Sequence, residues 1–314
     1  MLIRVQNLVK RYKDVLALDH LNLEVHEGEI LGLLGPNGSG KTTAINCILA
    51  LLTYDKGSIE VFGKPMTPHS YESKRNIGIV LQNVAVFDEL TVYENVDYFC
   101  GLYVADRALR AEYVASAIEF VGLQDYARRL PPKLSGGLRR RLNIACGIAH
   151  RPKLLILDEP TVAVDPQSRN AILEGLRRLN ELGTAIVYTS HYMEEVEQLC
   201  SRIIIIDHGR TIAGGTTAEL KAMINVGEAI SVELLELSPA QLDGIRHLPR
   251  VNSAEYNQNM LQVRYSGGSH NLIDLLDHLR DKGLSYGRVY AEQPTLNDVF
   301  LEITGRQLRD PEVV

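Results

Sequence analysis

The stretch that decides the fold of this sequence is Gly35-Pro36-Asn37-Gly38-Ser39-Gly40-Lys41-Thr42-Thr43. It lies between a strand-like apolar run that ends at Leu34 and a helical pattern that begins at Lys41. Glycines let successive backbone N–H groups turn inward as a nest for phosphate oxygens, and the helix N-terminus adds partial positive charge. In the pattern G-x-x-x-x-G-K-[ST], the lysine reaches the β- and γ-phosphates and the next hydroxyl ligates Mg²⁺. The stretch therefore predicts a nucleotide site in which Lys41 and Thr42 have these two roles.

A second stretch, Leu154 to Glu159, supplies the acidic half of such a site. An apolar strand ends at Asp158, which places its carboxylate beside the phosphate loop, where it can hold Mg²⁺ through water. Glu159 follows at once and points elsewhere, because successive strand residues face opposite sides. A carboxylate next to the γ-phosphate is a candidate general base for the attacking water.

Strand and helix patterns alternate around these two stretches. Helical periods occupy 41–52 and 88–122, and from Ser135 onward a helix, a strand (154–157), a helix (167–182), a strand (185–189) and a helix (193–199) follow one another. This alternation is typical of an α/β fold in which helices flank a largely parallel sheet. Residues 203–213 are expected to form a hairpin with His208-Gly209 in its turn.

The pattern changes near Val226-Gly227. The remainder is expected to fold as a small α+β module, with strands at 230–234, 253–256, 261–265 and 287–290 and helices at 239–248, 272–280 and 296–303. The last residues are polar and contain proline, which is typical of a loose tail. We therefore expect domains at 1–223 and 224–305, followed by a flexible tail at 306–314.

Composition limits the classes of function. The formal net charge of −6 argues against a general nucleic-acid binder, which usually has a basic excess. The apolar runs are far shorter than the ~20 residues of a membrane helix, and the N-terminus lacks the apolar core of a signal peptide. The four cysteines are scattered in apolar stretches and are expected to be buried, reduced and structural. We expect a cytosolic protein whose membrane role, if it has one, comes through a partner.

The string Leu134-Ser135-Gly136-Gly137-Leu138-Arg139-Arg140-Arg141 resembles the signature of ABC transporter ATP-binding subunits. The resemblance implies that Ser135, Gly136 and Gly137 bind the γ-phosphate held by the opposite subunit, at a second helix N-terminus. Leu138 replaces the usual glutamine, as in the drug-resistance exporter branch. The implied fold is a P-loop ATPase core with an antiparallel β subdomain and a helical subdomain.

Further landmarks follow in the order of the family, over about residues 1–223. Tyr12 matches the aromatic residue that stacks on adenine, and Gln82 matches the glutamine that contacts Mg²⁺ and the attacking water. Asp165 matches the loop that crosses the dimer interface, although Val162-Ala-Val precedes it where the family has Ser-Gly-Leu or Ala-Gly-Leu. His191 matches the histidine that hydrogen-bonds the γ-phosphate.

The resemblance thus implies a complete set of site residues. The catalytic residues are Glu159, His191 and Gln82, and the Mg²⁺ ligands are Thr42, Gln82 and Asp158. The ATP-binding residues are Tyr12, Gly35, Pro36, Asn37, Gly38, Ser39, Gly40, Lys41, Thr42, Thr43, Ser135, Gly136, Gly137 and Asp165. The other histidines, including His150, His208 and His278, are expected to be structural, and Arg139 to Arg141 to be solvated or salt-bridged, some of them near the ATP phosphates of the dimer.

The resemblance also implies partners. Two such chains clamp two ATP molecules and act on the cytoplasmic face of a membrane permease, whose coupling helix would contact 83–103; burial of Val86, Phe87 and Tyr93 in the helical subdomain is the alternative. Residues 224–314 resemble the C-terminal extension of exporter ATPases, notably at Pro294 to Gly305, and would serve dimer contact or regulation. We expect export of a drug, antibiotic or other hydrophobic or amphipathic compound. The alternatives are a soluble ABC ATPase of translation or DNA repair, and a regulatory ATP-binding protein that does not hydrolyse ATP.

Overall fold

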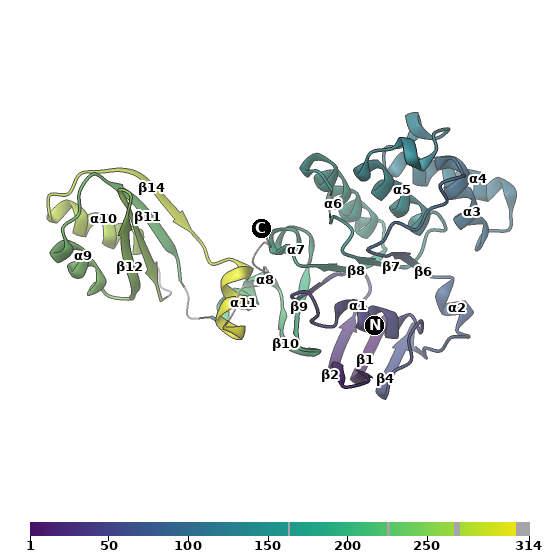
Figure 1. Cartoon of the computed structure of the whole chain (residues 1–314), viewed down its shortest axis with the longest axis horizontal. Coiled ribbons are helices and arrows are strands. Elements are labelled where there is room, and N and C mark those ends of the chain that lie inside the picture. The colour runs from purple at the N-terminus through teal and green to yellow at the C-terminus, as the bar shows by residue number, and fades with distance from the viewer. Residues whose placement is uncertain (163, 225–226, 267–270, 306–314) are drawn as a thin grey trace. The chain divides into compact units, whose positions relative to one another are not determined.

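The computed structural model describes residues 1–314 except 163, 225–226, 267–270 and 306–314 (Figure 1). The chain divides into two compact units, Met1–Thr217 and Ala218–Gln307. Each unit has its own cluster of buried apolar side chains. The tail expected at 306–314 lies outside the described residues.

A six-stranded sheet forms the centre of the first unit, in the order β10-β9-β3-β8-β7-β6. Its strands are β3 (Ile30–Leu34), β6 (Ile77–Val80), β7 (Leu154–Asp158), β8 (Ala185–Ser190), β9 (Arg202–Asp207) and β10 (Arg210–Gly215). All neighbours pair in parallel except β9 and β10, which form the expected hairpin. The expected α/β fold is confirmed. Because parallel strands end at the same edge, the segments after β3, β6, β7 and β8 meet there.

An antiparallel sheet, in the order β2-β1-β4-β5, lies beside the first. Its strands are β1 (Ile3–Tyr12), β2 (Val15–Val25), β4 (Lys56–Val61) and β5 (Lys64–Pro65). Helix α1 (Lys41–Ile48) buries Ile45 and Ile48 in a core that both sheets share. The phosphate loop before α1 is therefore anchored between two sheets.

Helices α3 (Val92–Gly101), α4 (Arg107–Phe120) and α5 (Gly136–Ile148) pack together as the helical part of this unit (Figure 1). The helix expected at 88–122 is thus two helices. Thr91 caps the first helix in a capping box with Glu94, and Asp106 caps the second, so the break falls between Gly101 and Arg107. The remaining elements of this unit are α2 (Tyr71–Lys74), the 3₁₀ turns η1 (Gln124–Tyr126) and η2 (Pro131–Lys133), α6 (Pro166–Glu181) and α7 (Met193–Leu199).

The second unit follows the expected order of strands and helices. After α8 (Thr217–Ala222), which spans the division, it contains β11 (Ala229–Leu234), α9 (Pro239–Arg246), β12 (Val251–Asn257), β13 (Met260–Tyr265), α10 (Asn271–Asp281), β14 (Tyr286–Glu292) and α11 (Leu296–Thr304). The antiparallel sheet has the order β12-β13-β11-β14, so the unit is a β-α-β-β-α-β arrangement. Alternate strand residues such as Ile230, Val232, Leu261 and Val263 are buried with Leu275 and Leu279.

Two sequence expectations can be judged from burial and helix length. Within the described part of the chain, no helix is both long enough and apolar enough to span a lipid bilayer. All four cysteines are buried and free, as expected. Burial raises the pKa of Cys47 to about 11 and raises the pKa of Cys146 and Cys200 still further, so these thiols stay protonated.

Candidate active site

The phosphate loop requires glycine at its close approaches. Gly38 and Gly40 have φ angles of 78° and 106°, in the left-handed region. A Cβ atom on Gly40 would lie 2.7 Å from the Ala17 carbonyl oxygen, so only glycine fits against β2. Lys41 then begins α1, which directs the N-terminus of this helix at the loop.

Lys41 is buried inside the loop. Its Nζ donates hydrogen bonds to the Gly35 and Pro36 carbonyl oxygens at 2.7 and 3.1 Å, and it lies 3.7 Å from Glu159 Oε1. Burial lowers the pKa of Lys41, and the charges of Glu159 and Asp158 oppose that shift. The ammonium is thus held by carbonyls and a carboxylate, next to the amides that would receive phosphate oxygens.

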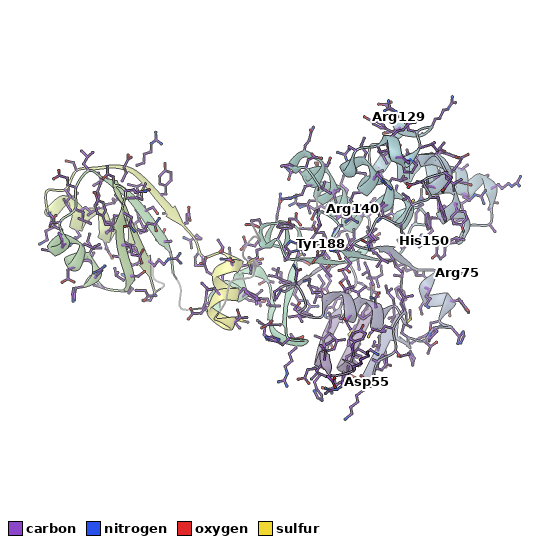
Figure 2. All side chains as sticks on the ribbon, in the orientation of Figure 1. Asp55, Arg75, Arg129, Arg140, His150 and Tyr188 are labelled. Carbon is purple, nitrogen blue, oxygen red and sulfur yellow. The ribbon has the colours of Figure 1, made fainter. Side chains whose placement is uncertain are left out.

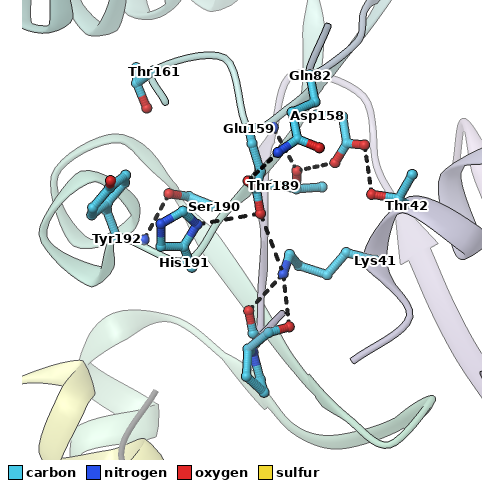
Figure 3. A network of polar contacts seen from close by, with 12 residues as sticks. Lys41, Thr42, Gln82, Asp158, Glu159, Thr161, Thr189, Ser190, His191 and Tyr192 are labelled. Carbon is cyan, nitrogen blue, oxygen red and sulfur yellow. Dashed lines mark hydrogen bonds and ion pairs between the residues drawn. The ribbon is translucent and has the colours of Figure 1, made fainter. Parts of the chain in front are cut away.

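Asp158 is hydrogen-bonded by two threonines (Figure 3). Thr42 Oγ1 donates to Asp158 Oδ2 at 2.8 Å, and Thr189 Oγ1 donates to Asp158 Oδ1 at 2.6 Å. A hydroxyl and a carboxylate are the hard oxygen donors that Mg²⁺ prefers, and proteins commonly hold this ion with one carboxylate plus substrate phosphates. The described residues contain no cluster of three His, Cys, Asp or Glu side chains that would bind a metal by itself. The donor set therefore fits Mg²⁺ bound together with a nucleotide.

Glu159 faces three side chains that sequence reasoning had placed in the site (Figure 3). Gln82 Nε2 donates to Glu159 Oε2 at 3.2 Å, and His191 Nδ1 and Lys41 Nζ lie 3.4 and 3.7 Å from Oε1. The pKa of the Glu159 carboxyl is lowered, chiefly by His191 and then by Lys41, against the effect of burial. The carboxylate is therefore ionised at neutral pH, as a general base must be.

The backbone at Glu159 is unusual for a non-glycine residue, with φ at 48°. Its N–H donates to Thr189 Oγ1 at 2.9 Å, so one threonine hydroxyl links both acidic residues. Sequence reasoning missed Thr189 as a site residue, although it stands in the Thr189-Ser-His191 string at the end of β8.

One pocket is lined by six residues of the phosphate loop together with Gln82 and Glu159. Its lining combines Val15, Leu16 and Ala17 of β2 with Asn37, Gly38, Gly40, Lys41, Thr42, Thr43, Gln82, Glu159 and His208. Tyr12 ends β1 just before this part of β2. The residue is 44% exposed, and Lys10 Nζ lies 5.3 Å from the centre of its ring. His208, expected to be structural, also lines the pocket.

Ser135, Gly136, Gly137 and Asp165 form a separate cluster, and none of them is among the described residues that line the pocket. Ser135 caps α5 by accepting from the Leu138 N–H at 3.3 Å, and Asp165 caps α6 by accepting from the Ser168 N–H at 2.9 Å. The bond from Ser168 lowers the pKa of Asp165. Two helix N-termini thus lie side by side outside the chain's own nucleotide pocket.

The three arginines after the signature differ from one another. Arg139 pairs with Asp88 at 2.9 Å and Arg141 donates to Ser168 at 3.5 Å. Arg140 is buried, contrary to the expectation of a solvated or salt-bridged residue, and its guanidinium donates to backbone carbonyls.

Comparisons with known proteins agree with this geometry. Residues 18–162 match the family model "ABC transporter", and residues 215–304 match "ATP-binding protein DrrA1-3-like, C-terminal domain". The linearmycin resistance ATP-binding protein LnrL of Bacillus subtilis (strain 168) is 38% identical over 98% of this chain and 100% of its own. The daunorubicin resistance ATP-binding protein DrrA3 of Streptomyces coeruleorubidus is 36% identical over 99% of this chain and 98% of its own.

Solved structures match about two thirds of the chain. An ATP-binding subunit of an ABC transporter superposes with a TM-score of 0.66 and 25% identity, over 71% of this chain and 93% of its own. A dimeric ATP-binding cassette in a post-hydrolysis state with ADP and Pi gives a TM-score of 0.63 and 27% identity, over 68% of this chain and 98% of its own.

The phosphate loop, the acidic strand end and the parallel sheet define a P-loop ATPase of the ATP-binding-cassette class. Similarity to resistance ATP-binding proteins over nearly the whole chain narrows the assignment from this class to one family. The chain belongs to the family of ABC transporter ATP-binding proteins, and it binds and hydrolyses ATP to energise transport.

Proposed function

We propose that this ATPase drives the export of a drug, antibiotic or other hydrophobic or amphipathic compound. The observation that carries the proposal is similarity across both units to proteins named for resistance to linearmycin and daunorubicin. A Nod factor export ATP-binding protein I of Cupriavidus metallidurans, 36% identical over 98% of this chain and 99% of its own, adds a relative named for export.

The proposed site uses one nucleotide pocket from each of two copies of this chain. Tyr12 stacks on adenine and residues 35–43 hold the phosphates. Thr42, Gln82 and Asp158 would hold Mg²⁺, which would supply positive charge to the phosphate oxygens. Ser135, Gly136, Gly137 and Asp165 of the second copy close over the nucleotide. Support comes from the paired helix N-termini, which lie apart from the pocket of their own chain.

The proposed reaction is attack of water on the γ-phosphorus. Glu159 accepts a proton from the water as its oxygen bonds to phosphorus, while the bond to the β,γ-bridging oxygen breaks and ADP leaves with the electron pair. Gln82 orients the water, and His191 and Lys41 stabilise the charge on the γ-phosphate. The ionised state of Glu159 and its contacts with these three residues support the assignment.

We propose that a membrane permease recruits the chain to the cytoplasmic face of the membrane and contacts it near 83–103. Phe87, Tyr93 and Tyr98 are between 41% and 48% exposed there, which favours a docking surface over burial within the helical part. Residues 224–305 would form an accessory domain for dimer contact or regulation. No nucleic-acid partner is proposed.

The test is purification of a tagged Glu159→Gln chain with Mg-ATP from detergent-solubilised cells, because loss of the base should trap the ATP-bound dimer. We expect a polytopic membrane protein in stoichiometric amount and a second ATPase chain of the same mass. The surface variant Glu194→Gln is the matched control. Ribosomal or DNA-repair proteins without a membrane protein would contradict the proposal. Deleting the recovered permease should then sensitise cells to the exported compound in a panel of antibiotics.

A further inference from the structure

A buried arginine joins the signature helix to the two strand ends that carry the candidate catalytic residues. Arg140, on α5, is only 4% exposed. Its Nη1 donates to the Leu81 carbonyl oxygen at 2.9 Å, and its Nη2 donates to those of Gln82 and Glu159 at 2.8 and 3.2 Å. Figure 2 places Arg140 where the helical part of the unit meets the six-stranded sheet.

Burial of the Arg140 guanidinium carries a cost in free energy that its hydrogen bonds must offset. An arginine stays charged in proteins, and a buried charge requires full hydrogen bonding. Burial lowers the pKa of Arg140, and the charges of Tyr188 and Asp158 oppose the shift. Among the described residues, no carboxylate lies within ion-pair distance of this guanidinium. Its partners are carbonyl dipoles, so its hydrogen bonds depend on the position of the main chain at Gln82 and Glu159.

Helix α5 connects this contact to the signature residues. The helix begins at the Ser135 cap and contains Gly136, Gly137 and Arg140 in one continuous run to Ile148. Its far end packs tightly on β6, where a Cβ atom on Gly147 would lie 2.9 Å from Val80 Cγ2. A shift of the first turn of α5 therefore moves the guanidinium relative to the ends of β6 and β7.

We propose that Arg140 is a positioning residue for ATP hydrolysis. Its planar, multi-donor guanidinium fixes the main chain at Gln82 and Glu159 to α5, so the base and the water-orienting amide take up their positions together with the signature helix. The inference rests on the roles proposed above for these two residues. Lysine, with a single ammonium, would hold fewer of the carbonyls, and methionine would hold none.

The experiment compares Arg140→Met and Arg140→Lys with the matched control Arg139→Met in the full chain. Arg139 is its neighbour on α5, but it is only half-buried and pairs with Asp88. Misplacement of reacting groups by about 1 Å can cost about 100-fold, so we expect kcat of Arg140→Met to fall by about 10- to 100-fold. KM for ATP should stay within about twofold of wild type, because the phosphate loop is untouched. Arg140→Lys should lie in between, and Arg139→Met should resemble wild type.

A double-mutant cycle with Gln82→Ala separates positioning from a general structural role. Positioning predicts that Arg140→Met costs less in the Gln82→Ala background than in wild type. Equal kcat for Arg140→Met and Arg139→Met, or strict additivity with Gln82→Ala, would overturn the inference. If Glu159→Gln hydrolyses ATP as fast as wild type, the proposed catalytic roles fail instead. A loss in Glu159→Gln without a loss in Arg140→Met refutes the inference alone.

Discussion

Thr189 illustrates how one hydroxyl can organise two acidic residues. It donates to Asp158 Oδ1 at 2.6 Å and accepts from the Glu159 N–H at 2.9 Å, and it is fully buried. A hydroxyl can donate and accept at once, which a methyl group of the same size cannot do. The strained backbone at Glu159, with φ at 48°, is therefore fixed by a side chain from the neighbouring strand.

We expect Thr189→Val to destabilise the first unit by about 1–3 kcal/mol, because a buried N–H and a carboxylate oxygen each lose a partner while the side-chain volume is kept. Thr189→Ser keeps the hydroxyl and is the matched control. Denaturant unfolding measures the difference. Equal stability of the two variants would mean that water replaces the hydroxyl.

The contact between His191 and Glu159 leads to a prediction for the pH dependence of hydrolysis. His191 is the largest cause of the lowered pKa of Glu159, and burial acts in the opposite direction. Removing the imidazole in His191→Ala should therefore raise the Glu159 pKa. Because the ionised carboxylate is the base, activity is lost as pH falls through this pKa, and the acidic limb of the rate profile should move to higher pH.

Single-turnover hydrolysis of radiolabelled ATP between about pH 4 and pH 8 measures this limb even when turnover is slow. The exposed surface residue His69 provides the control, since His69→Ala should leave the limb in place. An acidic limb that stays where it is in His191→Ala would show that Glu159 does not set it.

At the scale of elements, the closest approach in the signature cluster is between the first turns of α5 and α6. A Cβ atom on Gly137 would lie 2.6 Å from Ser168 Oγ and 3.0 Å from Asp165 Oδ2. Asp165 also caps α6, by accepting a hydrogen bond from the N–H of Ser168 in the first turn of that helix. Any side chain at position 137 must therefore separate the two helix N-termini or break this cap.

We expect Gly137→Ala to leave ATP affinity of the monomer near wild type and to abolish ATP-dependent dimerisation of a Glu159→Gln background. Overpacking of this kind costs about 1–3 kcal/mol. Equilibrium nucleotide binding and light scattering with ATP measure the two properties. Gly244→Ala is the control, because its nearest neighbour is 4.0 Å away. Normal dimerisation in Gly137→Ala would contradict the proposed interface.

Sequence reasoning was accurate where local pattern and chain order determine position. The phosphate loop, the acidic end of β7 and the histidine after β8 each follow a recognisable strand, and parallel strands deliver their ends to one edge. The split between α3 and α4 also had a local signal, since Asp106 is a preferred N-cap residue and lies directly before α4. The helical period expected over 88–122 did not take this capping residue into account.

Arg140 could not have been found in the same way. Three successive arginines on a helix point in different directions, and nothing in their sequence tells which one turns inward. The partners of Arg140 are backbone carbonyls, which carry no residue identity, and they lie 59, 58 and 19 positions away along the chain. Only the packing of α5 against the ends of β6 and β7 selects it.

At the scale of the whole molecule, each of the two units has an apolar core of its own. Leu23 is buried in the core that includes α1 and both sheets of the first unit, and Leu261 is buried under the helices of the second. The nucleotide pocket is lined entirely by residues of the first unit. ATP should therefore stabilise one unit and leave the other unchanged.

We expect calorimetry of the full chain to resolve two transitions. Leu23→Ala should lower the free energy of unfolding of one unit by about 2–5 kcal/mol, and Leu261→Ala that of the other, because each truncates a buried side chain in a different core. Each variant should therefore move one of the two transitions to lower temperature. ATP at about 100 times its Kd should raise the free energy of unfolding of the unit that Leu23→Ala destabilises by about 2.7 kcal/mol. The free energy of unfolding of the other unit should not change. A single transition, lowered by both substitutions and raised by ATP, would mean that the two cores unfold as one. In that case the C-terminal unit contributes directly to the stability of the ATPase, and nucleotide binding is felt throughout the chain.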